Sequence, residues 1–130
     1  MTSLLLDTHV LLWLDTAPEQ LSRLASDVIE RADELAVAPI TWFELAWLAQ
    51  NRRIEPPSPV HVWLQTLFRR VITTPLTPAI ATTAVSLPES FPRDPADRII
   101  YATAIENGWQ LVTRDPRLRD HPHSRQVTVW

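Results

Sequence analysis

The stretch LLLDTHVLLWL, residues 4–14, holds a single formal charge, that of Asp7, between two apolar segments. The leucines before Asp7 form a short apolar run typical of a buried strand, and the residues after Thr8 and His9 are helix-like. A lone carboxylate at such a junction is costly unless something compensates its charge. Asp7 therefore either caps the helix that follows it or acts together with acids elsewhere in the chain.

The same alternation of short apolar runs and helical segments continues to the C-terminus. The strands are continuous apolar runs rather than alternating ones, which favours a parallel sheet with helices on both faces. We therefore expect an α/β fold, a three-layer sandwich with a central, mostly parallel sheet flanked by helices, in a single domain of residues 1–130. The predicted strands are residues 3–6, 35–39, 71–76, 109–113 and 126–130, and the predicted helices are residues 9–15, 21–32, 41–52, 59–70, 77–87 and 94–108.

The ends of several predicted helices carry recognisable signals. Thr77 is an expected N-cap, and Thr41 is a possible one. The clearest helix is DPADRIIYATAIENG, in which Asp94 is the expected N-cap, a proline follows in the first turn and Gly108 ends the helix. These signals set the helix boundaries on which the position of the charged residues depends.

Four carboxylates draw attention by their positions. Asp7 and Asp115 follow predicted strands, which is where open parallel sheets place their sites. Glu44 is the only polar residue in WFELAWLA, and Asp97 lies in the first turn of the helix that Asp94 caps. Each acid also has a structural explanation: Asp7 and Asp115 as caps, Glu44 in a buried salt bridge with an arginine, and Asp97 as a favourable charge at a helix N-terminus.

Taken together, these acids point to metal chemistry. Parallel topology could bring all four to one edge of the sheet, where clustered carboxylates would repel one another and some would be protonated without a cation. Magnesium and manganese prefer such hard oxygen ligands and retain several waters. Such a site suits hydrolysis of a phosphodiester, because the metal activates a water and neutralises the phosphate oxygens.

The composition excludes several other classes of protein. A single glycine cannot build the glycine-rich dinucleotide or phosphate loops or the serine nucleophile elbow, and the absence of lysine removes catalysis by lysine. The chain has no cysteine, which excludes thiolate zinc sites and fits the cytoplasm, where we expect the protein. The net charge of −3 argues against nucleic-acid binding by bulk charge. Neither a membrane span nor a signal peptide is expected.

Four segments in order, DTHVLLWL, TWFELAWL, DPADRIIYATA and LVTRD, resemble the PIN-domain ribonucleases. Their order and spacing are similar to those of the VapC-type toxins of bacterial toxin–antitoxin pairs, and the resemblance runs from Leu4 to about Leu118. It implies helices around a parallel sheet and cleavage of RNA that depends on Mg²⁺ or Mn²⁺. It also implies a small cognate antitoxin as partner and a homodimer.

The resemblance assigns roles to particular residues. The catalytic acids would be Asp7, Glu44, Asp97 and Asp115. Asp7, Asp97 and Asp115 would contact the metal, with Glu44 acting directly or through water. Thr113 matches an auxiliary hydroxyl residue just before the last acid.

One departure from the family pattern lies in NRRI, residues 51–54, which lacks the glycine that many relatives carry before the basic residue. This difference affects the shape of a loop rather than the chemistry.

Other functions remain open at this stage. A receiver domain needs a lysine, and a haloacid-dehalogenase-like phosphatase would want an aspartate where His9 stands. A non-catalytic PIN-like module that binds another protein is still possible, since six tryptophans could form a contact surface as well as a core. If RNA is the substrate, the candidate contacts are the arginines near the acids in the sequence, which are Arg93, Arg98, Arg114 and Arg117. Each of them could equally belong to a solvated charged face.

Overall fold

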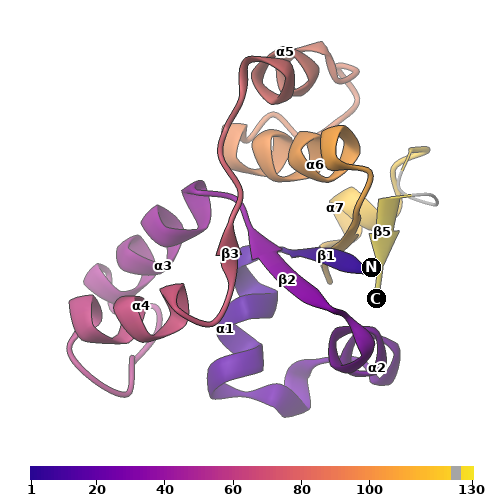
Figure 1. Cartoon of the computed structure of the whole chain (residues 1–130). Coiled ribbons are helices and arrows are strands. Elements are labelled where there is room, and N and C mark those ends of the chain that lie inside the picture. Colours follow the sequence, from indigo (N-terminus) through magenta and orange to yellow (C-terminus); the bar gives the residue numbers. More distant parts are fainter. Residues whose placement is uncertain (124–126) are drawn as a thin grey trace.

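The computed structural model describes residues 1–123 and 127–130 and is built around one five-stranded sheet (Figure 1). All strand pairs among these residues are parallel, in the order β3-β2-β1-β4-β5. The α/β sandwich expected from the sequence is confirmed. The strands are β1 (Ser3–Leu6), β2 (Glu34–Val37), β3 (Ile72–Thr73), β4 (Gln110–Val112) and β5 (Thr128–Val129). Gln126, the first residue of the last predicted strand, lies outside the described residues.

The first strand of the chain occupies the centre of the sheet. Leu5 of β1 is in register with Ala36 of β2 on one side and with Leu111 of β4 on the other. The chain adds β2 and β3 in one direction from β1 and later adds β4 and β5 in the other. The direction of winding therefore reverses between β1 and β4, and sites in such folds lie at this reversal, beyond the carboxyl ends of the strands.

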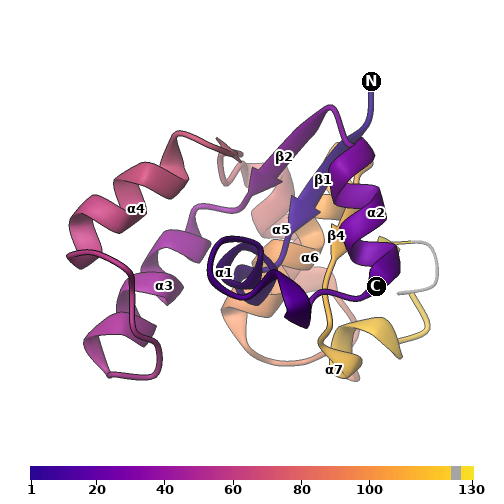
Figure 2. The ribbon, with the colours of Figure 1, turned by 90° about the horizontal axis from the view of Figure 1, so that it is seen from below.

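Helices cover both faces of the sheet, as the two sides of β1 show. Leu4 and Leu6 belong to a core cluster shared with α1, α2 and α4, whereas Leu5 points into a second cluster shared with α6 and α7. Figure 2 views the first of these faces, with α1 and α2 in front of the strands. The helices are α1 (Thr8–Thr16), η1 (Pro18–Gln20), α2 (Arg23–Arg31), α3 (Ile40–Gln50), α4 (Val60–Phe68), α5 (Pro78–Ser86), α6 (Pro95–Asn107) and α7 (Pro116–Arg119).

Most helix ends follow the predicted signals. Thr77 accepts a hydrogen bond from the backbone N–H of Ile80, and Asp94 caps α6 through two backbone N–H groups. Gly108 ends α6 with a φ of 66°, a left-handed conformation that glycine adopts without steric cost. The prediction that Thr41 caps α3 is wrong. Thr41 lies inside the helix and is fully buried.

In the NRRI loop, which has no glycine, an arginine adopts a left-handed backbone conformation. Arg52 directly follows the C-cap residue Asn51 and has a φ of 54°. A side chain in this left-handed region meets a steric penalty that glycine avoids. Among the described residues, no helix is both long enough and apolar enough to cross a bilayer.

Candidate active site

Asp7 lies at the reversal of the sheet, directly after β1, and both of its carboxylate oxygens are engaged. Oδ1 accepts a hydrogen bond of 2.8 Å from the backbone N–H of Thr8, which is its capping role. Oδ2 accepts one of 2.7 Å from the hydroxyl of Thr113, which directly follows β4. The Thr113 hydroxyl oxygen in turn accepts a bond of 3.1 Å from the backbone N–H of Asp115. Asp7 is thus both a helix cap and a partner of residues at the far end of the chain.

Glu44 reaches the same region from α3. The buried hydroxyl of Thr8 donates to its Oε1 at 2.6 Å and lies 3.0 Å from the hydroxyl of Thr41. Because a hydroxyl carries one proton, Thr41 is the donor to Thr8. The ion pairs of the described residues do not include Glu44, so the structural alternative for this residue, a buried salt bridge to an arginine, is not found.

Asp97 and Asp115 are joined by a single cation from the chain itself, Arg117. Its Nη2 lies 3.0 Å from Oδ2 of Asp97 and 2.6 Å from Oδ2 of Asp115. Its Nε also donates to both oxygens of Asp115, at 3.1 Å and 3.2 Å. Oδ1 of Asp115 also accepts a hydrogen bond of 2.9 Å from the backbone N–H of Arg117. Through this bond Asp115 caps the short helix α7.

These carboxylates affect one another's protonation. Burial raises the pKa of Asp97 to about 7, and the neighbouring acids add to this rise while Arg117 opposes it. Burial also raises the pKa of Asp7 and of Glu44, although hydrogen bonds from threonines oppose it at both. Burial also acts to raise the pKa of Asp115, but the hydrogen bonds and the charge of Arg117 outweigh this effect. The pKa of Asp115 therefore lies below its usual value. Without a metal ion, Asp7, Glu44 and Asp97 therefore take up a proton more readily than isolated acids do.

All four predicted acids line one open pocket of about 640 Å³, which we call the acid pocket. It lies at the carboxyl end of the sheet between α1, α3, α6 and α7. Its walls also include Asp94, the cap of α6, and a cation–aromatic pair in which Arg114 lies 5.6 Å from the ring centre of Trp13. The remaining lining residues are Thr8, His9, Pro116 and Arg117.

The acid pocket fits a divalent cation in its chemistry, but not with its side chains as they lie. Within residues 1–123 and 127–130, no three carboxylates or imidazoles are close enough together to hold one ion. Arg117 instead bridges Asp97 and Asp115. Its position demonstrates that these two carboxylates can share a positive charge. The Arg117 side chain is 59 % exposed, so it has room to turn outward and leave oxygen ligands of the kind that Mg²⁺ and Mn²⁺ prefer.

The four candidate arginines have different surroundings. Arg98 donates five hydrogen bonds to backbone carbonyls, one in the last turn of α5 and four in the segment between α5 and α6. These bonds occupy its guanidinium, and Arg98 does not line the acid pocket, so the structure gives no support to its candidacy as an RNA contact. Arg114 and Arg117 line the acid pocket, and Arg93 is exposed outside it.

Sequence reasoning missed two residues that orient the acids. Thr8 and Thr41 form a buried hydroxyl chain that ends on Glu44. The only signal for Thr8 was its place beside Asp7, and the apolar surroundings of Thr41 suggested a helix cap instead. Sequence reasoning also did not anticipate that Arg117 bridges two of the acids.

The match to the PIN domain family extends over residues 4–123, and the chain belongs to this family. It is similar to ribonuclease VapC22 of Mycobacterium tuberculosis, with 62 % identity over 130 residues that cover all of both chains. Two solved structures share the fold. A toxin–antitoxin complex from Klebsiella pneumoniae has a TM-score of 0.69 at 22 % identity, covering 97 % of this chain and 95 % of that one. VapBC2 from Rickettsia felis, bound to a DNA fragment from its promoter, has a TM-score of 0.69 at 14 % identity, covering 98 % of each chain.

Proposed function

We propose that this protein is an endoribonuclease that hydrolyses phosphodiester bonds of RNA, and that it is the toxin of a toxin–antitoxin pair. The observation that carries the proposal is the convergence of Asp7, Glu44, Asp97 and Asp115 on one pocket at the reversal of a PIN-domain sheet. The full-length similarity to a protein named a ribonuclease supports the same activity.

We further propose that the activity depends on Mg²⁺ or Mn²⁺, held by Asp7, Asp97 and Asp115, with Glu44 acting directly or through water. When bound, such an ion supplies an activated water and neutralises negative charge on the phosphate. For this to happen Arg117 must release Asp97 and Asp115. The acid pocket is lined by five carboxyl groups and only two arginines, and a divalent cation would favour the ionised form of these acids more strongly than a guanidinium does.

The other residues of the site orient the acids and the substrate. Thr113 holds Asp7 in one orientation through its hydroxyl, and Thr8 does the same for Glu44. Fixed ligand orientation of this kind commonly strengthens metal sites. Arg114, stacked on Trp13 at the wall of the acid pocket, is placed to contact a phosphate of the bound strand.

Partners follow from the same family membership. The solved relatives are toxin–antitoxin complexes, which supports a small cognate antitoxin as the inhibitor of this chain. We propose that the chain works as a single domain, residues 1–130, in the cytoplasm and as a homodimer. Sedimentation of the purified protein tests the dimer.

A cleavage assay tests the proposed activity. Purified protein is incubated with end-labelled single-stranded RNA in Mg²⁺, in Mn²⁺ and in a chelator. We expect cleavage only with metal, and a loss on the order of 10²-fold or more in Asp97→Ala, since the variant lacks a catalytic carboxylate. The matched control is Asp27→Ala, an exposed acid of α2 outside the acid pocket. If wild type cleaves nothing in either metal, the alternative of a non-catalytic protein-binding module gains support.

A further inference from the structure

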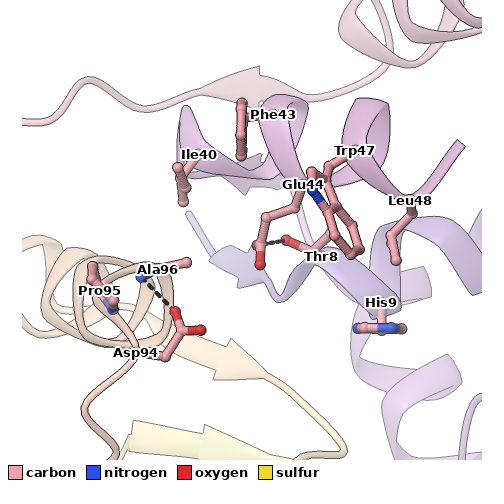
Figure 3. Close-up of a pocket in the computed structure, with 10 residues that line it drawn as sticks. All are labelled: Thr8, His9, Ile40, Phe43, Glu44, Trp47, Leu48, Asp94, Pro95 and Ala96. Carbon is pink, nitrogen blue, oxygen red and sulfur yellow. Dashed lines mark hydrogen bonds between the residues drawn. The ribbon is translucent and has the colours of Figure 1, made fainter. Parts of the chain in front are cut away.

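A second pocket, of about 390 Å³, opens between α3 and the first turn of α6 (Figure 3). This volume falls in the range of roughly 300–1,000 Å³ that is usual for small-molecule sites. We call it the apolar pocket. Its apolar walls are Ile40, Phe43, Trp47 and Leu48 from α3 and Pro95 and Ala96 from α6.

Two aromatic rings of this pocket are left open to solvent. Phe43 is 65 % exposed and Trp47 is 47 % exposed, whereas Trp63 in the core is only 2 % exposed. Large exposed rings on a small domain are a cost in water unless a ligand covers them. Aromatic faces bind planar partners well, because stacking adds to the burial of apolar surface.

The charges of the apolar pocket select what can enter it. Its charged walls are the carboxylates of Glu44 and Asp94, and no arginine lines it among the described residues. Thr8 engages Oε1 of Glu44, and backbone N–H groups of α6 engage Oδ1 of Asp94. Among the described residues, the second carboxylate oxygen of Glu44 and of Asp94 accepts no hydrogen bond. Such a wall repels phosphate but accepts hydrogen bonds from the amino and ring N–H groups of a nucleobase.

The apolar pocket is continuous with the acid pocket. The two share four lining residues, Thr8, His9, Glu44 and Asp94. In Figure 3 Glu44 lies between the Trp47 ring and the first turn of α6, at this boundary. Whatever fills the apolar pocket therefore lies directly beside the bond that the acids would cleave.

We propose that the apolar pocket binds one nucleobase of single-stranded RNA, next to the scissile phosphate, by stacking on Trp47 and donating hydrogen bonds to Glu44 or Asp94. This inference rests on the proposed ribonuclease function and adds to it a base subsite. Single-stranded RNA is the appropriate substrate form, since only an unpaired base can leave its stack and enter a pocket.

The first experiment uses free nucleosides, which lack phosphate and so probe the apolar pocket separately from the acids. Adenosine, cytidine, guanosine and uridine are titrated into ¹⁵N-labelled wild type, with the Trp47 indole N–H signal assigned by comparison with Trp47→Phe. We expect this signal to shift and saturate for at least one nucleoside. The indole signal of buried Trp63 serves as the internal control.

The second experiment measures the affinity for a labelled single-stranded RNA in a chelator, where no cleavage is expected. Trp47→Ala should weaken binding by roughly tenfold, the usual effect of losing one base–aromatic stack. Trp47→Phe should keep most of the affinity, because it retains a ring. Phe68→Ala is the matched control, since Phe68 is 52 % exposed and lines neither pocket.

The outcomes separate this proposal from the proposed activity. A saturable shift at Trp47 together with weaker RNA binding by Trp47→Ala supports the base subsite, even if no metal condition yields cleavage. An indole signal that ignores all four nucleosides, with unchanged RNA affinity of Trp47→Ala, overturns the subsite and leaves the pocket to a protein partner. Equal losses in Trp47→Ala and Phe68→Ala also overturn it, because they indicate a general effect on the fold.

Discussion

Two arginines near the acids, Arg98 and Arg117, occupy opposite kinds of surroundings. Arg98 donates to five carbonyl groups in the last turn of α5 and the segment that connects α5 to α6, and its guanidinium also lies 5.8 Å from the ring centre of Phe91. Arg117 stands in the open mouth of the acid pocket between two carboxylates. One arginine organises a loop, whereas the other balances charge in the candidate active site.

The two guanidinium groups differ in the charge of their partners. Carbonyls carry no net charge, so Arg98 stays bound whatever cation is present. The partners of Arg117 are carboxylates, which a divalent cation can claim instead. Single substitutions distinguish the structural arginine from the exchangeable one.

Arg98→Ala should have the largest effect on stability. Its loss leaves five carbonyls without their donor, and we expect the free energy of unfolding to fall by about 3 kcal/mol, in line with hydrogen bonds from a charged group. Urea denaturation measures the change, and Arg93→Ala, an exposed neighbour, should be nearly neutral. A loss equal to that of Arg93→Ala would refute the structural role.

Arg117→Gln should change metal affinity more than stability. Removing the guanidinium leaves Asp97 and Asp115 without a competing cation, so we expect Mn²⁺ to bind about tenfold more tightly in calorimetry, a change of roughly 1.4 kcal/mol. Arg114→Gln removes the same charge from the same pocket without a bond to the acids, and separates competition from net charge. Weaker Mn²⁺ binding by Arg117→Gln would mean that Arg117 assists the metal.

Arg52→Gly tests a third arginine, which is strained rather than bonded. Its φ of 54° favours glycine, and removing the side chain should stabilise the fold by about 1 kcal/mol. Thermal and urea unfolding measure this gain. Arg53→Gly, next to it without a left-handed φ among the described residues, should give no gain. A loss of stability at position 52 would show that the arginine makes a favourable contact there.

A further prediction concerns the pH dependence of stability in the metal-free protein. The pKa of Asp97 is raised from 3.8 to about 7, so the folded state binds this proton more tightly than the unfolded chain. The contribution of Asp97 to stability is therefore fully present below about pH 4 and is lost as the pH rises through about 7. Unfolding in a chelator at acidic and alkaline pH measures it. Asp97→Asn, which resembles the protonated acid, should lack this part of the slope, and an identical slope in both proteins would contradict the raised pKa.

Local signals in the sequence determined much of this protein. Apolar runs, caps such as Thr77 and Asp94, and the stop at Gly108 were enough to predict the strand and helix order, because each depends on residues a few positions apart. Asp7 and Asp115 could be placed near each other, because the carboxyl ends of parallel strands meet at one edge.

Only the tertiary structure decided which side chains meet across that edge. The bond from Thr113 to Asp7 joins residues 106 positions apart, and the pairing of Arg117 with Asp97 depends on how α7 lies against α6. The opposite roles of Arg98 and Arg117 also depend on this packing. Composition and spacing specify which elements form, but the partner of a long polar side chain is chosen by the three-dimensional arrangement of donors and acceptors around it.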